Sequence, residues 1–358
     1  MVAAAGTAVP VKRFEQGNSA PTLIVGPAWV GDMVMAQSLF RFLREQEPDR
    51  ALDVVAPAWS EPLLARMPEV RHRFLFPAGH GELMLRERLR LARSLRRNGY
   101  ARAIVLPRTY KSALVPFFAR IPRRIGMVGE QRWGLLTDLR RFGENGPRRV
   151  FERFVSLGLP AGAALPRDVP RPALRASPPG VEAALHALRL DGNGPVLALC
   201  PGAAFGESKR WPPAHFAELA RRRLDDGWRV WLLGSRQDRH ATRAIHHTVP
   251  DAADLAGLTN LEQVIDLLSI ADAIVSNDSG LMHIAAALGR PLVAVYGSSD
   301  PGITPPLSPR ARALWLNLEC SPCFQRTCPL GHTDCLWKLT PDHVDQALTD
   351  LCGAAARA

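Results

Sequence analysis

Short apolar runs alternate along this chain with longer stretches in which apolar residues recur every three or four positions. Short continuous runs bounded by turn residues predict buried strands, and the longer periodic stretches predict amphipathic helices. The predicted strands cover residues 22–26, 51–56, 73–76, 103–106, 196–200, 229–233, 273–276 and 292–296. The predicted helices cover residues 30–45, 82–97, 111–119 (interrupted by Pro116), 213–226, 239–247, 261–269, 281–288 and 341–352. This alternation predicts an α/β fold whose parallel sheets carry helices on both faces.

The alternation stops between residues 159 and 180 and then begins again. Six prolines stand in this stretch without any periodicity, which favours an extended linker. A chain of 358 residues is long enough for two domains, and we expect two doubly wound, Rossmann-like domains facing a central cleft. The predicted parts are a disordered extension at 1–20, an N-terminal domain at 21–165, a linker at 166–180, a C-terminal domain at 181–340, and a helix with a tail at 341–358.

Four loops of the C-terminal half follow predicted strands and are rich in small, polar and cationic residues. In open α/β sheets ligands bind at the carboxyl ends of the strands, so these loops are expected to face one crevice. The third loop, SNDSG, leads into a helix, whose free N–H groups and dipole favour a phosphate, most naturally one within a nucleotide. The alternative is that these are ordinary turn residues. The candidate residues are Pro201, Gly202, Ser208, Lys209, Gly234, Ser235, Asp238, Asp278, Ser279, Gly280, His283, Gly297, Ser298 and Ser299.

The N-terminal half contains one comparable loop, GPAWVGDM, between its first strand and first helix. Asp32 stands at the start of that helix, where an aspartate commonly caps or stabilises the first turn. The same position would let its carboxylate project into the cleft as a general base. The residues alone leave both interpretations open.

The chain has a formal net charge of +11, most of it from arginine. Such an excess favours anionic partners, and the arginine-rich helix 82–97 either lies on anionic lipid or presents a solvated outer face. Lys111, Arg120, Arg123 and Arg124 are candidates for holding a phosphorylated or carboxylated acceptor. Nucleic acid is not expected, since only 7% of the residues are aromatic and no binding module is present. No apolar run approaches the roughly 18–20 residues of a membrane span, and no signal peptide is evident, so we expect a cytoplasmic protein.

Four of the six cysteines form a compact cluster, C-x2-C-x4-C-x6-C. Four thiols can hold zinc, but this spacing is not that of a common zinc finger. Reduced structural cysteines are the favoured interpretation in a cytoplasmic chain, with a zinc site and a disulfide or redox role as alternatives. The cluster consists of Cys320, Cys323, Cys328 and Cys335.

Three segments together, GPAWVGDMVMAQSL, PGAAFGESKRWP and SNDSGLMHIAAALGRPLVAVYGSSDP, resemble the ADP-heptose:lipopolysaccharide heptosyltransferases, glycosyltransferase family 9. The similarity extends from about residue 22 to the C-terminal helix, and within the family it is greatest to the type II members. It implies a GT-B fold and inverting transfer of a heptose from ADP-heptose to the phosphorylated heptosyl-Kdo2-lipid A inner core. It further implies that the protein works at the cytoplasmic face of the inner membrane, and we expect a monomer without a cofactor.

The resemblance also implies roles for particular residues. Asp32 matches the family's base, and Lys209 matches its donor-binding lysine. Asp278, Ser279, Gly280 and His283 match its donor motif, whereas Asp238 is an incomplete match to a donor-sugar glutamate. A helix dipole and a lysine can offset the charge of the leaving ADP, so no metal is expected to be required. Another heptosyltransferase type, an epimerase of the same fold and a non-catalytic nucleotide-binding protein remain the alternatives.

Overall fold

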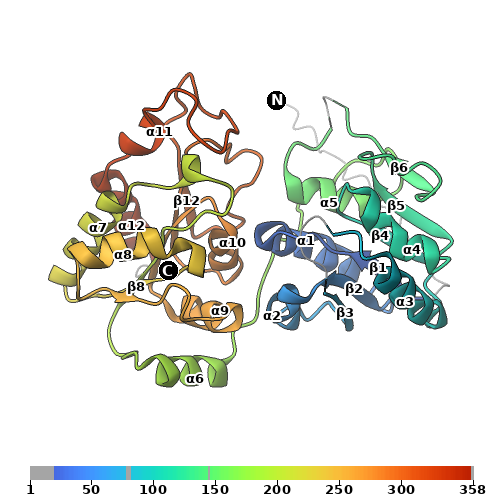
Figure 1. Ribbon diagram of the computed structural model, residues 1–358, viewed down its shortest axis with the longest axis horizontal. Coiled ribbons are helices and arrows are strands. Elements are labelled where there is room, and N and C mark those ends of the chain that lie inside the picture. Colours follow the sequence, from blue (N-terminus) through green and yellow to red (C-terminus); the bar gives the residue numbers. More distant parts are fainter. Residues whose placement is uncertain (1–19, 78–81, 144–145, 356–358) are drawn as a thin grey trace, which may run out of the picture.

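The computed structural model describes residues 20–77, 82–143 and 146–355, and the predicted extension at 1–20 lies almost wholly outside these residues. Two parallel β-sheets of six strands each form the cores of two domains that lie side by side (Figure 1). The strand order is β3-β2-β1-β4-β5-β6 in the first sheet and β12-β11-β10-β7-β8-β9 in the second. The predicted α/β class is therefore confirmed, and both sheets have the doubly wound order that reverses beside the first strand.

The strands of the first sheet are β1 (Thr22–Val25), β2 (Leu52–Pro57), β3 (His72–Phe76), β4 (Arg102–Val105), β5 (Arg123–Met127) and β6 (Asp138–Arg140). Its helices are α1 (Val30–Gln46), α2 (Glu61–Ala65), α3 (Leu85–Leu95), α4 (Leu114–Phe118) and α5 (Val150–Gly158). Helix α3 begins three residues later than predicted. Pro116 lies in the first turn of α4, where a missing N–H breaks no helical hydrogen bond, so it does not interrupt the helix.

The strands of the second sheet are β7 (Val196–Cys200), β8 (Arg229–Leu232), β9 (Ala253–Asp254), β10 (Ala273–Asn277), β11 (Leu292–Val295) and β12 (Ala311–Leu314). Its helices are α6 (Pro178–Leu188), α7 (Pro213–Asp225), α8 (Arg239–Thr248), α9 (Leu261–Ile270), α10 (Gly280–Ala287), α11 (Asp334–Trp337) and α12 (Pro341–Ala355). The C-terminal helix α12 packs against α7 and β11.

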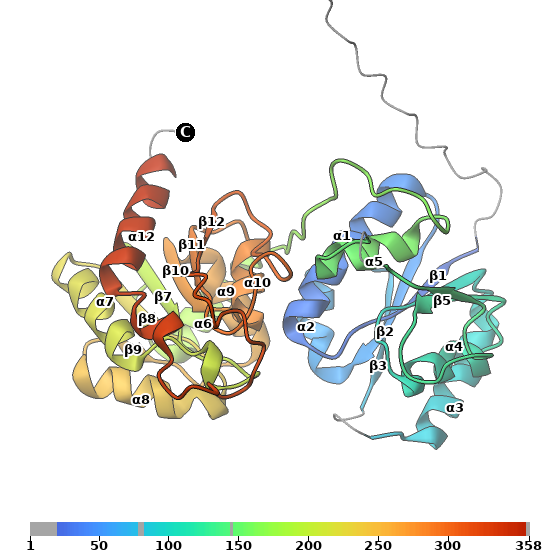
Figure 2. The ribbon, with the colours of Figure 1, turned by 90° about the horizontal axis from the view of Figure 1, so that it is seen from above.

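The two domains meet along helices that border their sheets. Figure 2 shows α1 and α2 of the first domain facing α9 and α10 of the second, and α1 packs directly on α10. One apolar cluster includes buried residues of both domains, among them Leu39, Met282 and Ile284. Within this interface Arg66 donates to the buried carboxylate of Asp266 at 2.8 Å, which ties α2 to α9. The relative position of the sheets is therefore fixed by packing as well as by the connecting chain.

The chain between α5 and α6 runs in an extended conformation along this interface. The amide of Gln37 donates to the carbonyl oxygen of Ala173 and accepts from its N–H. Beyond this, Ser177 caps α6 by accepting from the N–H of Gly180, with prolines in the first turn. The end of the predicted linker is thus the start of a helix. None of the helices in the described part of the chain combines the length and apolarity that crossing a bilayer demands.

Candidate functional site

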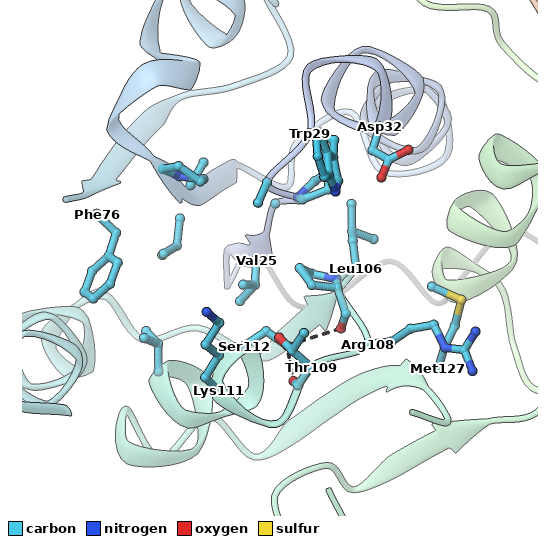
Figure 3. Close-up of a pocket in the computed structure, with 18 of the residues that line it drawn as sticks. Val25, Trp29, Asp32, Phe76, Leu106, Arg108, Thr109, Lys111, Ser112 and Met127 are labelled. Carbon is cyan, nitrogen blue, oxygen red and sulfur yellow. Dashed lines mark hydrogen bonds between the residues drawn. The ribbon is translucent and has the colours of Figure 1, made fainter. Parts of the chain in front are cut away.

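Asp32 lies in the first turn of α1, directly beyond the carboxyl end of β1. Trp29 is the N-cap residue, and its side chain makes no capping hydrogen bond, so the turn Gly26–Trp29 leads straight into the helix. The Asp32 side chain projects from this turn into a cavity (Figure 3). Burial raises the pKa of its carboxyl to about 6, with nearby Asp278 raising it further and Lys209 lowering it. The position is therefore one where a carboxylate can accept a proton near neutral pH.

The cavity beside Asp32 has a volume of about 850 Å³ and is lined by residues of the first domain. The carboxyl ends of β1, β2 and β4 form its apolar base, and Trp29, Trp59 and Phe76 add aromatic walls. Figure 3 shows Asp32 and Trp29 on one side and Lys111 on the opposite side. Aromatic walls with cations at the edge suit a sugar that carries acidic groups. The charged residues that line it are Asp32, Arg88, Arg108, Lys111, Glu130 and Arg153.

Of the four cations predicted to hold the acceptor, only Lys111 lines this cavity. Arg123 donates to Asp138 of the neighbouring strand at 3.3 Å, and Arg124 donates to the carbonyl oxygens of Ile121 and Leu135. Arg120 lies just beyond α4 with a positive φ of 58°. Acceptor binding by these three stays a prediction that would need a surface outside the cavity. Arg108 and Arg153 are lining cations that the sequence did not single out, because no motif marks them, and the buried Arg88 of the predicted arginine-rich helix lines the cavity as well.

Lys209 and Asp278 meet at the corresponding edge of the second sheet. Lys209 ends a single 3-10 turn, Glu207–Lys209, that follows β7, and Asp278 directly follows β10. The lysine Nζ lies 2.5 Å from Asp278 Oδ2, which also accepts from the Ser299 hydroxyl at 2.5 Å. Both Asp278 and Ser299 are buried, so the ion pair is held in a defined geometry. The predicted convergence of these loops is therefore present.

The starts of α1 and α10 touch across the domain boundary. A Cβ added to Gly31 would lie 2.6 Å from His283 Cδ2, and one added to Gly280 would lie 2.7 Å from Val30 Cβ. These two glycines are required by the close approach. His283 is buried, which lowers its pKa to about 4 and leaves the imidazole neutral at pH 7. This contact brings Asp32 of one domain within the electrostatic reach of Lys209 and Asp278 of the other.

Several other predicted donor residues have internal roles in the loops. The buried Ser208 hydroxyl lies 2.9 Å from that of Ser298, and Asn277 Nδ2 donates to the Pro201 carbonyl oxygen at 2.7 Å. These hydrogen bonds fix the conformation of the loops. Part of the role of these residues is therefore to position the loop backbone.

Asp238 has a role in its own turn. Its Oδ2 accepts from the N–H and the hydroxyl of Ser235, and its carboxyl lies so close to Gly202 that a Cβ there would overlap it. Gly234 also lies close to Asp238, since a Cβ added to this glycine would be 3.0 Å from the Asp238 Cβ. Ser279 is the N-cap residue of α10, and its hydroxyl lies 3.3 Å from that of Ser276.

All six cysteines of the chain are free thiols. Across the described ranges, no group of three or more His, Cys, Asp or Glu side chains is arranged to hold a metal ion. The N–H groups of the turn at residues 330–333 lower the pKa of the Cys328 thiol, whereas burial raises that of Cys335 to about 11. The predicted preference for reduced cysteines stays a prediction.

Comparison with known proteins now places the chain. Residues 88–334 match the family model of glycosyltransferase family 9 (heptosyltransferase). The chain is 44% identical over 339 residues to lipopolysaccharide heptosyltransferase 2 of Escherichia coli K12, covering 92% of this chain and 97% of that protein. It is 45% identical over 307 residues to lipooligosaccharide heptosyltransferase 2 of Haemophilus influenzae, covering 82% and 88%.

The fold agrees with these sequence matches. The solved structure of E. coli ADP-heptose lps heptosyltransferase II superimposes with a TM-score of 0.84 at 41% identity, covering 94% of this chain and 99% of that one. The predicted GT-B arrangement of two Rossmann-like domains is thereby confirmed. The predicted family is confirmed as well: this chain belongs to glycosyltransferase family 9, the heptosyltransferases.

Proposed function

We propose that this enzyme transfers a heptose from ADP-heptose to the heptosyl-Kdo2-lipid A inner core of lipopolysaccharide, which is supported by its similarity to proteins named lipopolysaccharide heptosyltransferase 2 and ADP-heptose lps heptosyltransferase II. One observation carries the mechanism. A half-buried carboxylate with a pKa of about 6, Asp32, lies across the domain boundary from a preformed ion pair of Lys209 and Asp278. A proton acceptor facing a cationic phosphate site is the arrangement that glycosyl transfer from a nucleotide sugar requires.

On the acceptor side, the core sugar occupies the cavity of the first domain. Asp32 takes the proton of the attacking hydroxyl as the new bond to the anomeric carbon forms, which inverts that centre. The cations at the cavity edge, Arg108, Lys111 and Arg153, bind acidic groups of the acceptor. Asp32 makes the attacking oxygen more nucleophilic only while its own carboxyl is ionised.

On the donor side, the bond between the anomeric carbon and the diphosphate breaks, and the departing phosphate oxygen keeps the electron pair. The added negative charge is offset by Lys209 and by the N-terminus of α10 at Ser279–Gly280. Asp278 and Ser299 hold the lysine in place from buried positions. This charge is what a divalent cation supplies in other transferases, so we expect transfer to persist in the presence of EDTA.

The acceptor is a glycolipid, and this favours a peripheral contact with the cytoplasmic face of the inner membrane. Two exposed large side chains, Leu83 and Tyr110, line the cavity, and the exposed Leu85 lies two residues beyond Leu83. Helix α3 starts at this point, and its exposed arginines would face anionic headgroups. These arginines are Arg86, Arg90 and Arg93, and the exposed Arg97 follows in the 3-10 turn beyond the helix. The lipid part of the acceptor could then stay in the bilayer while its sugar enters the cavity.

The decisive experiment is a transfer assay with ADP-heptose and defined acceptors, analysed by mass spectrometry. We expect the mass of one heptose to be added to heptosyl-Kdo2-lipid A, with release of ADP. Addition to Kdo2-lipid A instead would identify a different heptosyltransferase type. ADP binding without any transfer to either acceptor would favour a non-catalytic nucleotide-binding protein.

A further inference from the structure

The segment that carries the cysteine cluster, residues 320–335, lies against the donor-side loops of the second domain. The Phe324 N–H donates to the Ser298 carbonyl oxygen at 2.8 Å, and the Ser208 N–H donates to the Arg326 carbonyl oxygen at 3.2 Å. The Ser208 hydroxyl also donates to the carbonyl oxygen of Gln325. The backbone at residues 324–326 is therefore fixed to the loops that follow β7 and β11, which also carry Lys209 and Ser299.

The backbone contact between this segment and the loop after β7 is so close that the residue opposite Arg326 must be a glycine. A Cβ added to Gly206 would overlap the carbonyl oxygen of Arg326, so only glycine allows the two backbones to meet. Gly206 lies three residues before Lys209 in the same loop. The cysteine segment is thus seated on the lysine-bearing loop by main-chain contacts.

This seating brings a second cation to the ring that already contacts Lys209. The guanidinium carbon of Arg326 lies 5.3 Å from the centroid of the Phe205 ring, and Lys209 Nζ lies 5.0 Å from the same centroid. The lysine is paired with Asp278, whereas no ion pair within the described ranges includes Arg326. Its charge is held near the donor side by the backbone and an aromatic ring while its hydrogen-bonding groups remain exposed to solvent.

We propose that Arg326 binds the diphosphate of the nucleotide-sugar donor as a second cation beside Lys209. The proposal rests on the proposed function in taking the donor to be ADP-heptose. A diphosphate offers several oxygens, and a guanidinium can donate two parallel hydrogen bonds to one phosphate. Lys209 alone already uses part of its charge on Asp278, so a second cation would balance the leaving group more fully.

The proposal also assigns a structural role to the segment that carries the cysteine cluster. Arg326 stands between Cys323 and Cys328, within the C-x4-C part of the cluster. The turn at residues 330–333 directs its N–H groups at Cys328, which anchors the chain just beyond the arginine. The cysteine segment is then a structured support that presents one cation to the donor.

The test is the affinity of the full-length enzyme for ADP, AMP and adenosine, measured by isothermal titration calorimetry. We expect Arg326→Ala to weaken ADP binding about tenfold, since a charge-assisted hydrogen bond is lost. AMP should be affected less and adenosine hardly at all. Arg326→Lys should fall between the wild type and Arg326→Ala for ADP. The matched control is Arg243→Ala on α8, which removes an arginine that is also exposed but lies outside the candidate site, and it should leave all three affinities unchanged.

Two outcomes would overturn the assignment. One is that Arg326→Ala and Arg243→Ala bind ADP with equal affinity. The other is that Arg326→Ala loses as much affinity for adenosine as for ADP, which would mean that Arg326 contacts the nucleoside and not the diphosphate. In kinetics we expect a higher KM for ADP-heptose. The proposed function is tested separately from the role of Arg326. If the wild-type enzyme bound ADP but made no heptosylated product, the proposed transfer would be contradicted. The ADP affinities of the variants would still show whether Arg326 binds the diphosphate.

Discussion

The two domains have the same strand order, yet the aspartates at the carboxyl edges of their sheets lie in opposite electrostatic environments. Asp32 follows β1 and lies in a largely apolar cavity, where burial raises its pKa to about 6. Asp278 follows β10 and accepts from both Lys209 and Ser299 at 2.5 Å. Similar carboxylates on similar scaffolds therefore have different chemistry, because one is desolvated and the other is paired.

The difference indicates how work is divided between the domains. A carboxylate that must take a proton is useful only if no cation holds it permanently ionised, and the first domain gives Asp32 an apolar setting. A donor site must bind the negatively charged diphosphate both before and during transfer. The second domain therefore fixes its cation, Lys209, with a buried partner, Asp278. The electrostatic influence of Lys209 on Asp32 links the two sites across the boundary.

The largest expected effect comes from removing the proton acceptor. Asp32→Asn should lower kcat about 1,000-fold, within the range by which general-base catalysis accelerates reactions. ADP affinity should stay close to that of the wild type, because the donor residues lie in the other domain. The melting temperature should not fall, because burial disfavours the carboxylate charge that the substitution removes. Steady-state transfer kinetics, calorimetry with ADP and a thermal melt measure the three quantities.

Asp49→Asn, at an exposed position beyond α1, is the matched control and should behave like the wild type. If Asp32→Asn instead lost ADP binding, Asp32 would belong to the donor site, and the contrast between the two aspartates would not hold.

The central elements of both domains could be predicted because their strands are buried on both faces and are therefore continuously apolar. Strand β7 has its predicted bounds, and α1 differs by one residue. Strands β5 and β9 were not predicted, for the opposite reason. Strand β5 begins with Arg123 and Arg124, and β9 has only two residues, so neither shows an apolar run. Pairing with a neighbouring strand, which the local sequence does not encode, stabilises them.

Part of the candidate site followed from topology alone. Lys209 and Asp278 were expected together because the carboxyl ends of the adjacent parallel strands β7 and β10 share one edge. The contact between Gly31 and His283 could not be anticipated, since it depends on how two separate domains dock. Nor could the approach of Arg326 to Phe205, because about 120 residues separate them and the intervening loop has no periodic pattern.

A smaller effect is expected from the donor-side cation. Lys209→Ala should lower kcat/KM for ADP-heptose about 100-fold, because the leaving diphosphate loses its main counter-charge and Asp278 is left buried without its partner. Lys209→Arg should recover part of this activity, since the charge is retained while the geometry differs. Initial-rate kinetics at varied donor concentration test both variants. Unchanged kinetics in Lys209→Ala would remove the lysine from the donor site.

The smallest and most specific effect concerns pH. Asp32 must be ionised to accept a proton, so kcat/KM should be constant above pH 6 and fall about tenfold per unit below it, where the carboxyl is protonated. The wild-type acid limb should thus lie near pH 6 rather than near the ordinary aspartate value of 3.8. Lys209 lowers the pKa of Asp32 and Asp278 raises it, so their removal should displace the limb in opposite directions. Lys209→Met should move it to higher pH and Asp278→Asn to lower pH. Both variants will be slow, but the position of the limb does not depend on the maximal rate. Shifts of the same sign in both would mean that the limb reports another group, whereas opposite shifts would establish that the donor-side ion pair sets the basicity of a carboxylate in the other domain.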